Sequence, residues 1–426
     1  MYSSFLWVGF SLLEHPSPSP NGACPYIRGK FETEFSGESG LGSLIFRDRD
    51  KLSPRYVPSS LPHREAQLEA LSSFYMYKLD RPGGSCLTCC QLIGPVGTGK
   101  TACILNFGRA FESEAVKRRV KLRHAYLNCK VDGSNRYKLY RNLLSKVAPE
   151  VSTGGMSPEE MLHQLLEYLE AEKMLLMITV DEVGYFYRGS SEPLIYDLTR
   201  LNEIYPYKPC RVVGVAFISR SLEFHGKLDE SERSTLGRLI ISFPKYTASQ
   251  VRDILEERVE EAFQPGAVSE DVLDFVSEIV ADPPINGDMR VALDLLYYAG
   301  TLAENMGAER VTPEHIRRVY GETHPAITTQ DIIELDVHEK LTLYALLRLL
   351  EGRASPYATL SEIRDEYEFI CEERGLEPKG CFEELMQELL DRQIVEMKSL
   401  LKFTICDVPA GKLRAYLNGL LRRLER

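Results

Sequence analysis

Gly94-Pro95-Val96-Gly97-Thr98-Gly99-Lys100-Thr101 follows the pattern GxxxxGK[ST], between an apolar run at 86–93 and a helical pattern at 100–114. Glycines in such a loop let backbone N–H groups surround phosphate oxygens, and the dipole of the next helix adds positive potential. The lysine reaches the β- and γ-phosphates, and the final hydroxyl ligates Mg²⁺. The stretch therefore predicts a P-loop that binds ATP or ADP with Mg²⁺, and Lys100 becomes a catalytic candidate.

A second apolar run, 174–180, ends in Asp181-Glu182. A carboxylate at the C-terminal end of a strand can hold the magnesium ion, and the next carboxylate can polarise the attacking water. In a chain with a P-loop, this arrangement predicts that Asp181 binds the metal together with Thr101 and that Glu182 is catalytic. The alternative is an ordinary strand end with no role in a site.

Short apolar runs alternate with helical patterns in the first half of the chain, which predicts a parallel α/β sheet covered on both faces. The runs are 86–93, 121–127, 175–180, 211–218 and 239–243, and the helical patterns are 64–77, 100–114, 137–147 and 158–170. After Pro244 the strand pattern stops. Helical patterns at 248–263, 270–280, 288–305 and 313–320 then predict an all-α lid.

The C-terminal part has the order of a winged helix, in which three helices precede a β-hairpin. The helical patterns are 332–350, 360–375 and 379–391, and the apolar stretches are 394–397 and 401–406. The predicted domains are a tail (1–45), a P-loop α/β ATPase core (46–245), a lid (246–324) and a DNA-binding winged helix (325–426). The tail has a short apolar stretch at 5–13 with no preceding positive charge, unlike a signal peptide, and we leave it out of the fold.

The charge of the chain limits how it can meet nucleic acid. Its 426 residues include 51 Lys+Arg and 62 Asp+Glu, a net charge of -11. Because phosphate backbones attract positive surfaces, this balance excludes a protein that coats nucleic acid unspecifically. Residues 395–426 nevertheless hold seven Lys or Arg against three acids, a local charge of +4. The sequence is therefore compatible with DNA binding through a small basic surface.

The cysteines and the hydropathy exclude two other classes of protein. Ten cysteines are too few for a disulfide scaffold in a chain of this length. Cys86-Leu87-Thr88-Cys89-Cys90 lies in an apolar run with no second Cys/His pair at ligand spacing, so a buried strand is preferred over a zinc site. No run of 18 apolar residues occurs, so we expect no membrane partner.

The P-loop, the acid pair, the lid and the winged helix together resemble the archaeal origin-recognition initiators of the AAA+ class, relatives of the eukaryotic origin recognition complex. Val57-Pro58 and Arg64 match the family segment that borders the adenine. Tyr246 and Arg258 match nucleotide contacts at its junction between sheet and lid. Arg290, in Gly287-Asp288-Met289-Arg290, would sense the γ-phosphate. The alternative for Arg290 is a surface arginine beside an N-capping aspartate.

Two family positions differ in this chain. Ile218-Ser219-Arg220 has an arginine where the family has an asparagine that senses the γ-phosphate. The Asp-Pro-Arg of the family, whose arginine acts on the nucleotide of a neighbouring subunit, is replaced by Asp229-Glu230-Ser231, and Arg233 is out of step. Such an arginine can supply about 10³–10⁵ in rate, so we expect weak hydrolysis and a nucleotide that acts as a switch. Whether Arg220 or Arg233 replaces the missing groups stays open.

The resemblance also implies DNA contacts in two places. Family members bind DNA with an element between the P-loop helix and the acid-pair strand. Thr153-Gly154-Gly155 lies in the corresponding part of this chain. The alternative for these residues is a plain turn between two helices. In the winged helix the recognition-helix pattern carries three glutamates, which repel phosphate. A protein-binding surface is therefore the alternative to DNA contact there. The candidate DNA contacts of the winged helix are Lys379, Gln387, Arg392, Lys398 and Lys402.

The resemblance implies a replication initiator on the nucleoid, in the cytoplasm. Its expected partners are duplex origin DNA, paralogous initiator subunits and the replicative helicase. Two other functions stay open at this point. One is a P-loop signalling switch whose winged helix binds proteins, and the other is a DNA motor for branch migration, which the residues at 220 and 231 disfavour.

Overall fold

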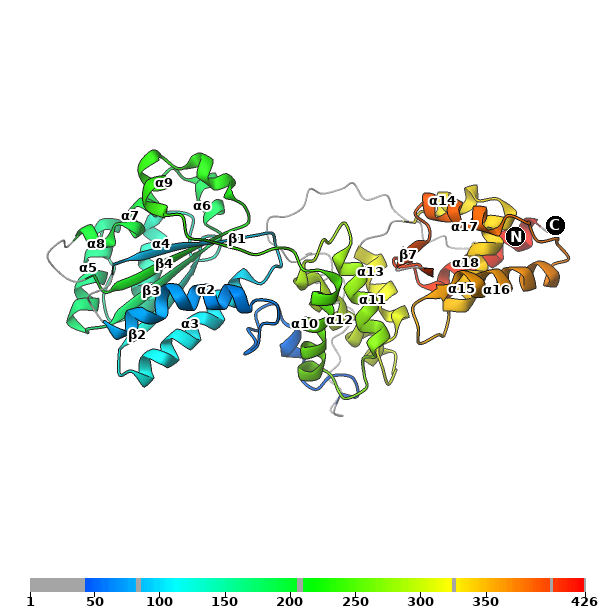
Figure 1. Cartoon of the computed structure of the whole chain (residues 1–426), viewed down its shortest axis with the longest axis horizontal. Helices are drawn as coiled ribbons and strands as arrows, with labels where there is room; N and C mark the ends of the chain where they lie inside the picture. Colours follow the sequence, from blue (N-terminus) through cyan, green and yellow to red (C-terminus); the bar gives the residue numbers. More distant parts are fainter. Residues whose placement is uncertain (1–42, 82–85, 205–209, 324–326, 399–400, 425–426) are drawn as a thin grey trace, which may run out of the picture. The chain divides into compact units, whose positions relative to one another are not determined.

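The computed structural model describes residues 43–81, 86–204, 210–323, 327–398 and 401–424. Its larger sheet has five strands, all parallel to their neighbours, in the order β2-β3-β4-β1-β5 (Figure 1). The predicted parallel sheet is thus confirmed. The strands are β1 (Thr88–Ile93), β2 (Leu122–Asn128), β3 (Leu175–Asp181), β4 (Val212–Ser219) and β5 (Ile240–Ser242).

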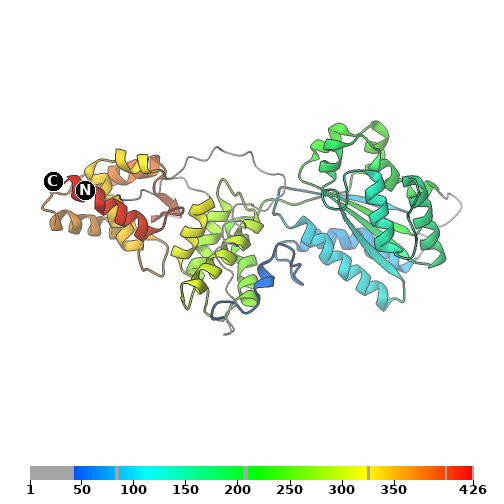
Figure 2. The ribbon, with the colours of Figure 1, turned by 180° about the vertical axis from the view of Figure 1, so that it is seen from behind.

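Helices cover both faces of this sheet, as Figures 1 and 2 show from opposite sides. Helices α2 (Glu65–Tyr75) and α3 (Lys100–Lys117) lie on one face, and α4 (Arg136–Val147) and α5 (Pro158–Ala171) lie on the other. Every residue of β3 and β4 is buried, because side chains from both faces of a central strand enter a core. Cys89 and Cys90 belong to β1, which confirms the interpretation of their run as a strand.

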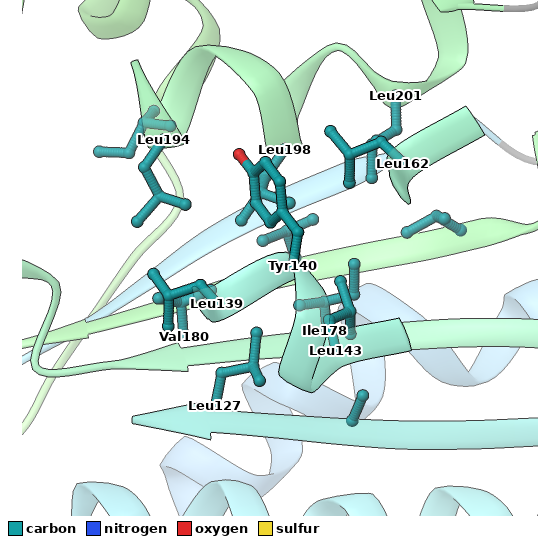
Figure 3. Close-up of a cluster of buried hydrophobic side chains, with 14 of the residues drawn as sticks. Leu127, Leu139, Tyr140, Leu143, Leu162, Ile178, Val180, Leu194, Leu198 and Leu201 are labelled. Carbon is teal, nitrogen blue, oxygen red and sulfur yellow. The ribbon is translucent and has the colours of Figure 1, made fainter. Parts of the chain in front are cut away.

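The core under α4 illustrates this packing (Figure 3). Alternate residues of β3 point to this face, and the residues between them point to the face of α2 and α3. The labelled members of the cluster on α4 and the sheet are Leu127, Leu139, Tyr140, Leu143, Ile178 and Val180. The parallel register then brings the C-terminal ends of the strands to one edge, where Asn128 is opposite Asp181 and Ile93 is opposite Ser219.

The lid consists of four helices and also holds the start of the described chain. The helices are α10 (Ala248–Ala262), α11 (Glu270–Ala281), α12 (Met289–Asn305) and α13 (Pro313–Thr323). Ile45 is fully buried, its carbonyl accepts a hydrogen bond from Gln264 N, and Phe46 packs on Phe263 with ring centroids 4.8 Å apart. The predicted boundary at 45/46 is therefore corrected: 45–52 pack on the lid, whereas residues 1–42 of the predicted tail lie outside the described residues.

The winged helix has more elements than its apolar pattern predicts. The predicted helix 332–350 is two helices, because Asp336 and Glu339 form a capping box that starts a new one. A short strand and a C-terminal helix were missed. The elements are α14 (Thr329–Glu334), α15 (Val337–Leu350), β6 (Ala358–Thr359), α16 (Leu360–Glu373), α17 (Phe382–Asp391), β7 (Glu396–Lys398), β8 (Lys402–Thr404) and α18 (Ala410–Leu424).

Arg317 on α13 joins the lid to the winged helix. Its side chain is 1% exposed, and its guanidinium donates to the carbonyls of Ile405 at 2.7 Å and Pro356 at 2.9 Å. It also lies over the ring of Phe275 in the lid, 5.2 Å from the centroid. A buried guanidinium needs hydrogen-bond acceptors, and those of Arg317 belong to the winged helix. These hydrogen bonds therefore connect the lid to the winged helix.

Candidate nucleotide-binding site

The P-loop connects β1 to α3 and takes its shape from two glycines. Gly97 and Gly99 have φ of 72° and 84°, a left-handed conformation that glycine adopts at no steric cost. Gly99 is the N-cap of α3, so the free N–H groups of the first turn of α3 begin at the end of the loop. This is the local geometry that binds phosphate at a helix N-terminus.

Lys100 is buried at the start of α3. Its ammonium donates to the carbonyls of Gly94, at 2.6 Å, and Pro95. Burial lowers the pKa of Lys100 to about 8, and the charges of Arg290 and Arg220 add to this effect against the attraction of Asp181. The ammonium is thus held within the loop, where a phosphate would compete with two neutral carbonyl acceptors.

Asp181 is the last residue of β3, and its carboxylate accepts three hydrogen bonds. Its Oδ2 accepts hydrogen bonds of 2.7 Å from both Thr101 Oγ1 and Tyr126 OH, and its Oδ1 accepts one from Glu182 N. Burial raises the pKa of Asp181 against these bonds. Carboxylate and hydroxyl oxygens are the ligands that Mg²⁺ prefers, so Thr101 and Asp181 fit the predicted metal.

Glu182 follows with a φ of 56° and pairs with two cations. Its Oε1 lies 3.2 Å from both Arg220 Nη2 and Lys130 Nζ. Burial alone would raise the pKa of Glu182, but the two cations outweigh it and the pKa is lowered. The carboxylate is therefore charged and paired at neutral pH.

The lid reaches the P-loop at the start of α12. Asp288 caps this helix, accepting from Arg290 N at 3.0 Å, and Met289 N donates to Gly97 O at 3.3 Å. The predicted capping role of Asp288 is confirmed. The side chain of Arg290 also lines the cavity next to the P-loop, so the position is compatible with both interpretations of this arginine.

Arg64 supports the loop from behind the cavity wall. It is 2% exposed, and its Nε donates to Thr98 O at 2.9 Å while its Nη2 donates to Pro244 O at 3.0 Å. The guanidinium carbon lies 3.9 Å from the ring centroid of Tyr246. Arg64 thus holds together the P-loop and the junction between sheet and lid, and it does not line the cavity.

The segment before the P-loop is fixed to α3. The carbonyls of Val57 and Pro58 accept hydrogen bonds from Arg109 and Asn106, respectively. Arg258 of the lid lies over the ring of Tyr56, 5.0 Å from its centroid. These contacts put 53–62 and the lid on either side of a shared opening.

That opening is a cavity of about 330 Å³. It brings together most of the residues that the sequence predicted, whereas Val57, Arg64, Gly94 and Pro95 support it from outside. The predicted residues in its lining are Pro58, Val96, Gly97, Thr98, Gly99, Lys100, Thr101, Asp181, Glu182, Tyr246, Arg258 and Arg290.

Sequence reasoning missed Tyr126, Asn128 and Lys130. The first two line the cavity, and the third pairs with Glu182. The signal that could have found them was the polar end of the apolar run 121–127, because C-terminal ends of parallel strands meet at the ligand-binding edge.

The predicted DNA contacts in the wing differ in accessibility. Lys398 is 8% exposed, and its ammonium pairs with Asp282 of the lid and, at 2.8 Å, with Glu396. In this structure its charge is directed to the lid and is not presented to a ligand. Lys402 is exposed, with its ammonium 5.4 Å from the ring centroid of Tyr357. Of the two predicted wing lysines, Lys402 therefore remains the candidate for a DNA contact.

The predicted DNA contacts near the recognition helix α17 are exposed, but each has an acidic hydrogen-bond partner. The partners are Asp336 for Lys379, Asp391 for Gln387 and Glu388 for Arg392.

The turn between α4 and α5 is open to solvent at Gly155. This residue has a φ of 80°, and a Cβ atom added to it would meet no atom within 4 Å, so a ligand can approach its backbone. Thr153 and Gly154 lie in the same turn.

Three family models match the chain domain by domain. They are an AAA domain at residues 87–225, a Cdc6 AAA+ ATPase-type lid domain at 252–321 and a Cdc6 C-terminal winged helix domain at 330–402. The ORC1-type DNA replication protein 2 of Saccharolobus solfataricus is 32% identical over 344 residues, which are 79% of this chain and 82% of that protein. The chain belongs to the ORC1-type DNA replication proteins. It is an AAA+ protein with a parallel sheet, a helical lid and a C-terminal winged helix.

Other ORC1-type relatives agree. The ORC1-type DNA replication protein 1 of Aeropyrum pernix is 33% identical over 80% of this chain and 84% of its own. Among solved structures, Cdc6p of Pyrobaculum aerophilum has a TM-score of 0.76 at 26% identity, covering 90% of this chain and all of that one. The ORC1 protein of Aeropyrum pernix in complex with DNA has a TM-score of 0.59 at 30% identity, with the same coverage.

Proposed function

We propose that this ORC1-type protein binds ATP or ADP with Mg²⁺ in the cavity between the P-loop and the lid, and duplex DNA at a replication origin. The nucleotide part is supported by the bond between Thr101 and Asp181, since it places two hard oxygen ligands beside a P-loop lysine. The DNA part is supported by the Aeropyrum pernix relative, which was solved in complex with DNA.

The DNA contacts that we propose lie in two domains. They are Lys402 in the wing with the exposed cations beside α17, and the open turn of 153–155 in the ATPase core. Backbone N–H groups of an unobstructed glycine turn suit phosphate oxygens, which fix position and carry no sequence information. The glutamates of α17 suit a basic protein partner, and we assign to this side the replicative helicase or a paralogous initiator subunit.

Hydrolysis should be weak in the isolated protein. Glu182 is paired with Arg220 and Lys130, and Ser231 stands where the family has its arginine finger. Arg233 is exposed, and its guanidinium donates to the carbonyls of His225 and Leu228 of its own chain, each at 3.0 Å. Multiple turnover on the order of 1 s⁻¹ would contradict this proposal.

The test is equilibrium binding by the full chain. ADP binding is measured with and without Mg²⁺, and DNA binding is compared between a duplex from an origin of the same genome and a duplex of shuffled sequence at one salt concentration. We expect Mg²⁺-dependent ADP binding and at least about a 10³-fold preference for the origin duplex. No ADP binding, or equal affinity for the two duplexes, would overturn the corresponding half of the proposal.

A further inference from the structure

The peptide unit between Thr98 and Gly99 lies in the P-loop just before α3, and both residues line the cavity. Gly99 has a φ of 84°, and a glycine lets the neighbouring peptide plane rotate at little steric cost. In a trans peptide the C=O and N–H groups point in opposite directions. A reversal of this plane would therefore present the carbonyl of Thr98 to a ligand in place of the N–H of Gly99.

Arg64 fixes the orientation of this peptide plane from behind the loop. Its Nε donates to the carbonyl of Thr98 at 2.9 Å, and Arg64 does not belong to the cavity lining. The carbonyl is therefore turned away from the cavity, and the N–H of Gly99 is turned toward it. The side chain of Thr98 is also held, because its Oγ1 donates to Pro95 O at 2.9 Å.

The guanidinium of Arg64 is itself fixed by its surroundings. It is buried, and its Nη1 and Nη2 donate to His63 O at 2.7 Å and to Pro244 O at 3.0 Å. Its carbon lies 3.9 Å from the ring centroid of Tyr246, at the junction between sheet and lid. Because each nitrogen of the planar group donates to a carbonyl, the group has one orientation here, and a lysine ammonium cannot reproduce it.

We propose that Arg64 is a positioning residue for phosphate binding: by holding the carbonyl of Thr98, it keeps the N–H of Gly99 directed at the phosphate oxygens. This inference rests on the nucleotide binding proposed above. A backbone N–H that meets an anionic oxygen makes a charge-assisted hydrogen bond, whereas a carbonyl in its place would repel the phosphate. Arg64 thus contributes to phosphate affinity through the loop, without contact to the nucleotide.

The experiment compares two ligands that share a nucleoside and differ in their phosphates. Dissociation constants of ADP and of adenosine are measured with the full chain for the wild type, Arg64→Gln and Arg64→Lys. We expect Arg64→Gln to weaken ADP binding about 10-fold, since one charge-assisted hydrogen bond is lost, and to leave adenosine binding unchanged. Arg64→Lys should weaken ADP binding as much, because one ammonium cannot hold the carbonyls of Thr98 and Pro244 together.

The lysine variant separates positioning from the charge of Arg64. Wild-type ADP affinity in Arg64→Lys would mean that only the positive charge matters, and equal weakening of ADP and adenosine would mean that the whole cavity is disturbed. Either result would overturn the inference. Arg317→Gln is the matched control, because it also removes a buried guanidinium that donates to carbonyls, and it should leave both affinities unchanged. Absence of ADP binding by the wild type would instead overturn the proposed function.

Discussion

The carboxylate of Asp288 in the lid lies directly against Gly97 of the P-loop. A Cβ atom added to Gly97 would be 1.8 Å from Asp288 Oδ1 and 2.7 Å from Asp288 Cα. The first turn of α12 therefore rests on the P-loop, and the contact requires a residue without a side chain at position 97.

This contact predicts the effect of Gly97→Ala. The methyl group would displace α12, and an alanine at a φ of 72° costs roughly 1–2 kcal/mol. We expect at least about a 10-fold loss of ADP affinity, measured by titration calorimetry, since a charge-assisted contact to phosphate is lost. Gly226→Ala is the control, because its Cβ would meet nothing within 4 Å and its residue does not line the cavity. Equal ADP affinities for wild type and Gly97→Ala would contradict the prediction.

The lowered pKa of Lys100 predicts that nucleotide affinity depends on pH. Phosphate favours the charged ammonium, so the pKa of Lys100 rises on binding from its value of about 8, and binding takes up a proton. Affinity should be constant below pH 8 and fall by up to about 10-fold per pH unit above it. Calorimetry in buffers of different ionisation enthalpy measures the proton uptake. An affinity that stays flat to about pH 9 would show that Lys100 is charged throughout.

The hydrogen bond from Thr101 to Asp181 predicts a selective loss of metal binding. Thr101→Ala removes one oxygen ligand and should reduce the gain in ADP affinity that Mg²⁺ provides by about 10-fold, the order expected for one ligand or its supporting group. Thr101→Ser keeps the hydroxyl and should retain the gain. The measurement is ADP affinity with Mg²⁺ and with EDTA. If alanine and serine behave alike, the hydroxyl does not bind the metal.

The two wing lysines should differ in their effect on DNA binding. Lys402→Ala removes an exposed cation and should flatten the slope of log affinity against log salt by about 0.9, the value for one phosphate contact. Lys398→Ala should leave the slope unchanged, because its ammonium is held by Asp282 and Glu396. A flattened slope with Lys398→Ala would mean that this lysine leaves the lid when DNA binds.

Much of the fold follows from periodicity and motif. The buried strands and the P-loop helix are long, strongly patterned segments, and the structure has them where the sequence predicts them. The break in 332–350 was missed because apolar residues continue on both sides of it, whereas the capping box of Asp336 and Glu339 starts a new helix. Short β6 has only two residues, too few to create a pattern.

The site was predictable where a short sequence motif fixes the chemical role of a residue. Lysine and threonine after a glycine loop, and an acid at a strand end, meet that condition. The choice of ion-pair partner does not meet it: Lys398 and Lys402 look equivalent in sequence, yet Lys398 pairs with Asp282, 116 residues away, whereas Lys402 is exposed. Such pairings are set by tertiary packing, which one sequence does not reveal.

The buried Arg317 couples the winged helix to the lid. Because its guanidinium holds carbonyls of the winged helix while its own helix belongs to the lid, a shift of α13 should carry the wing with it.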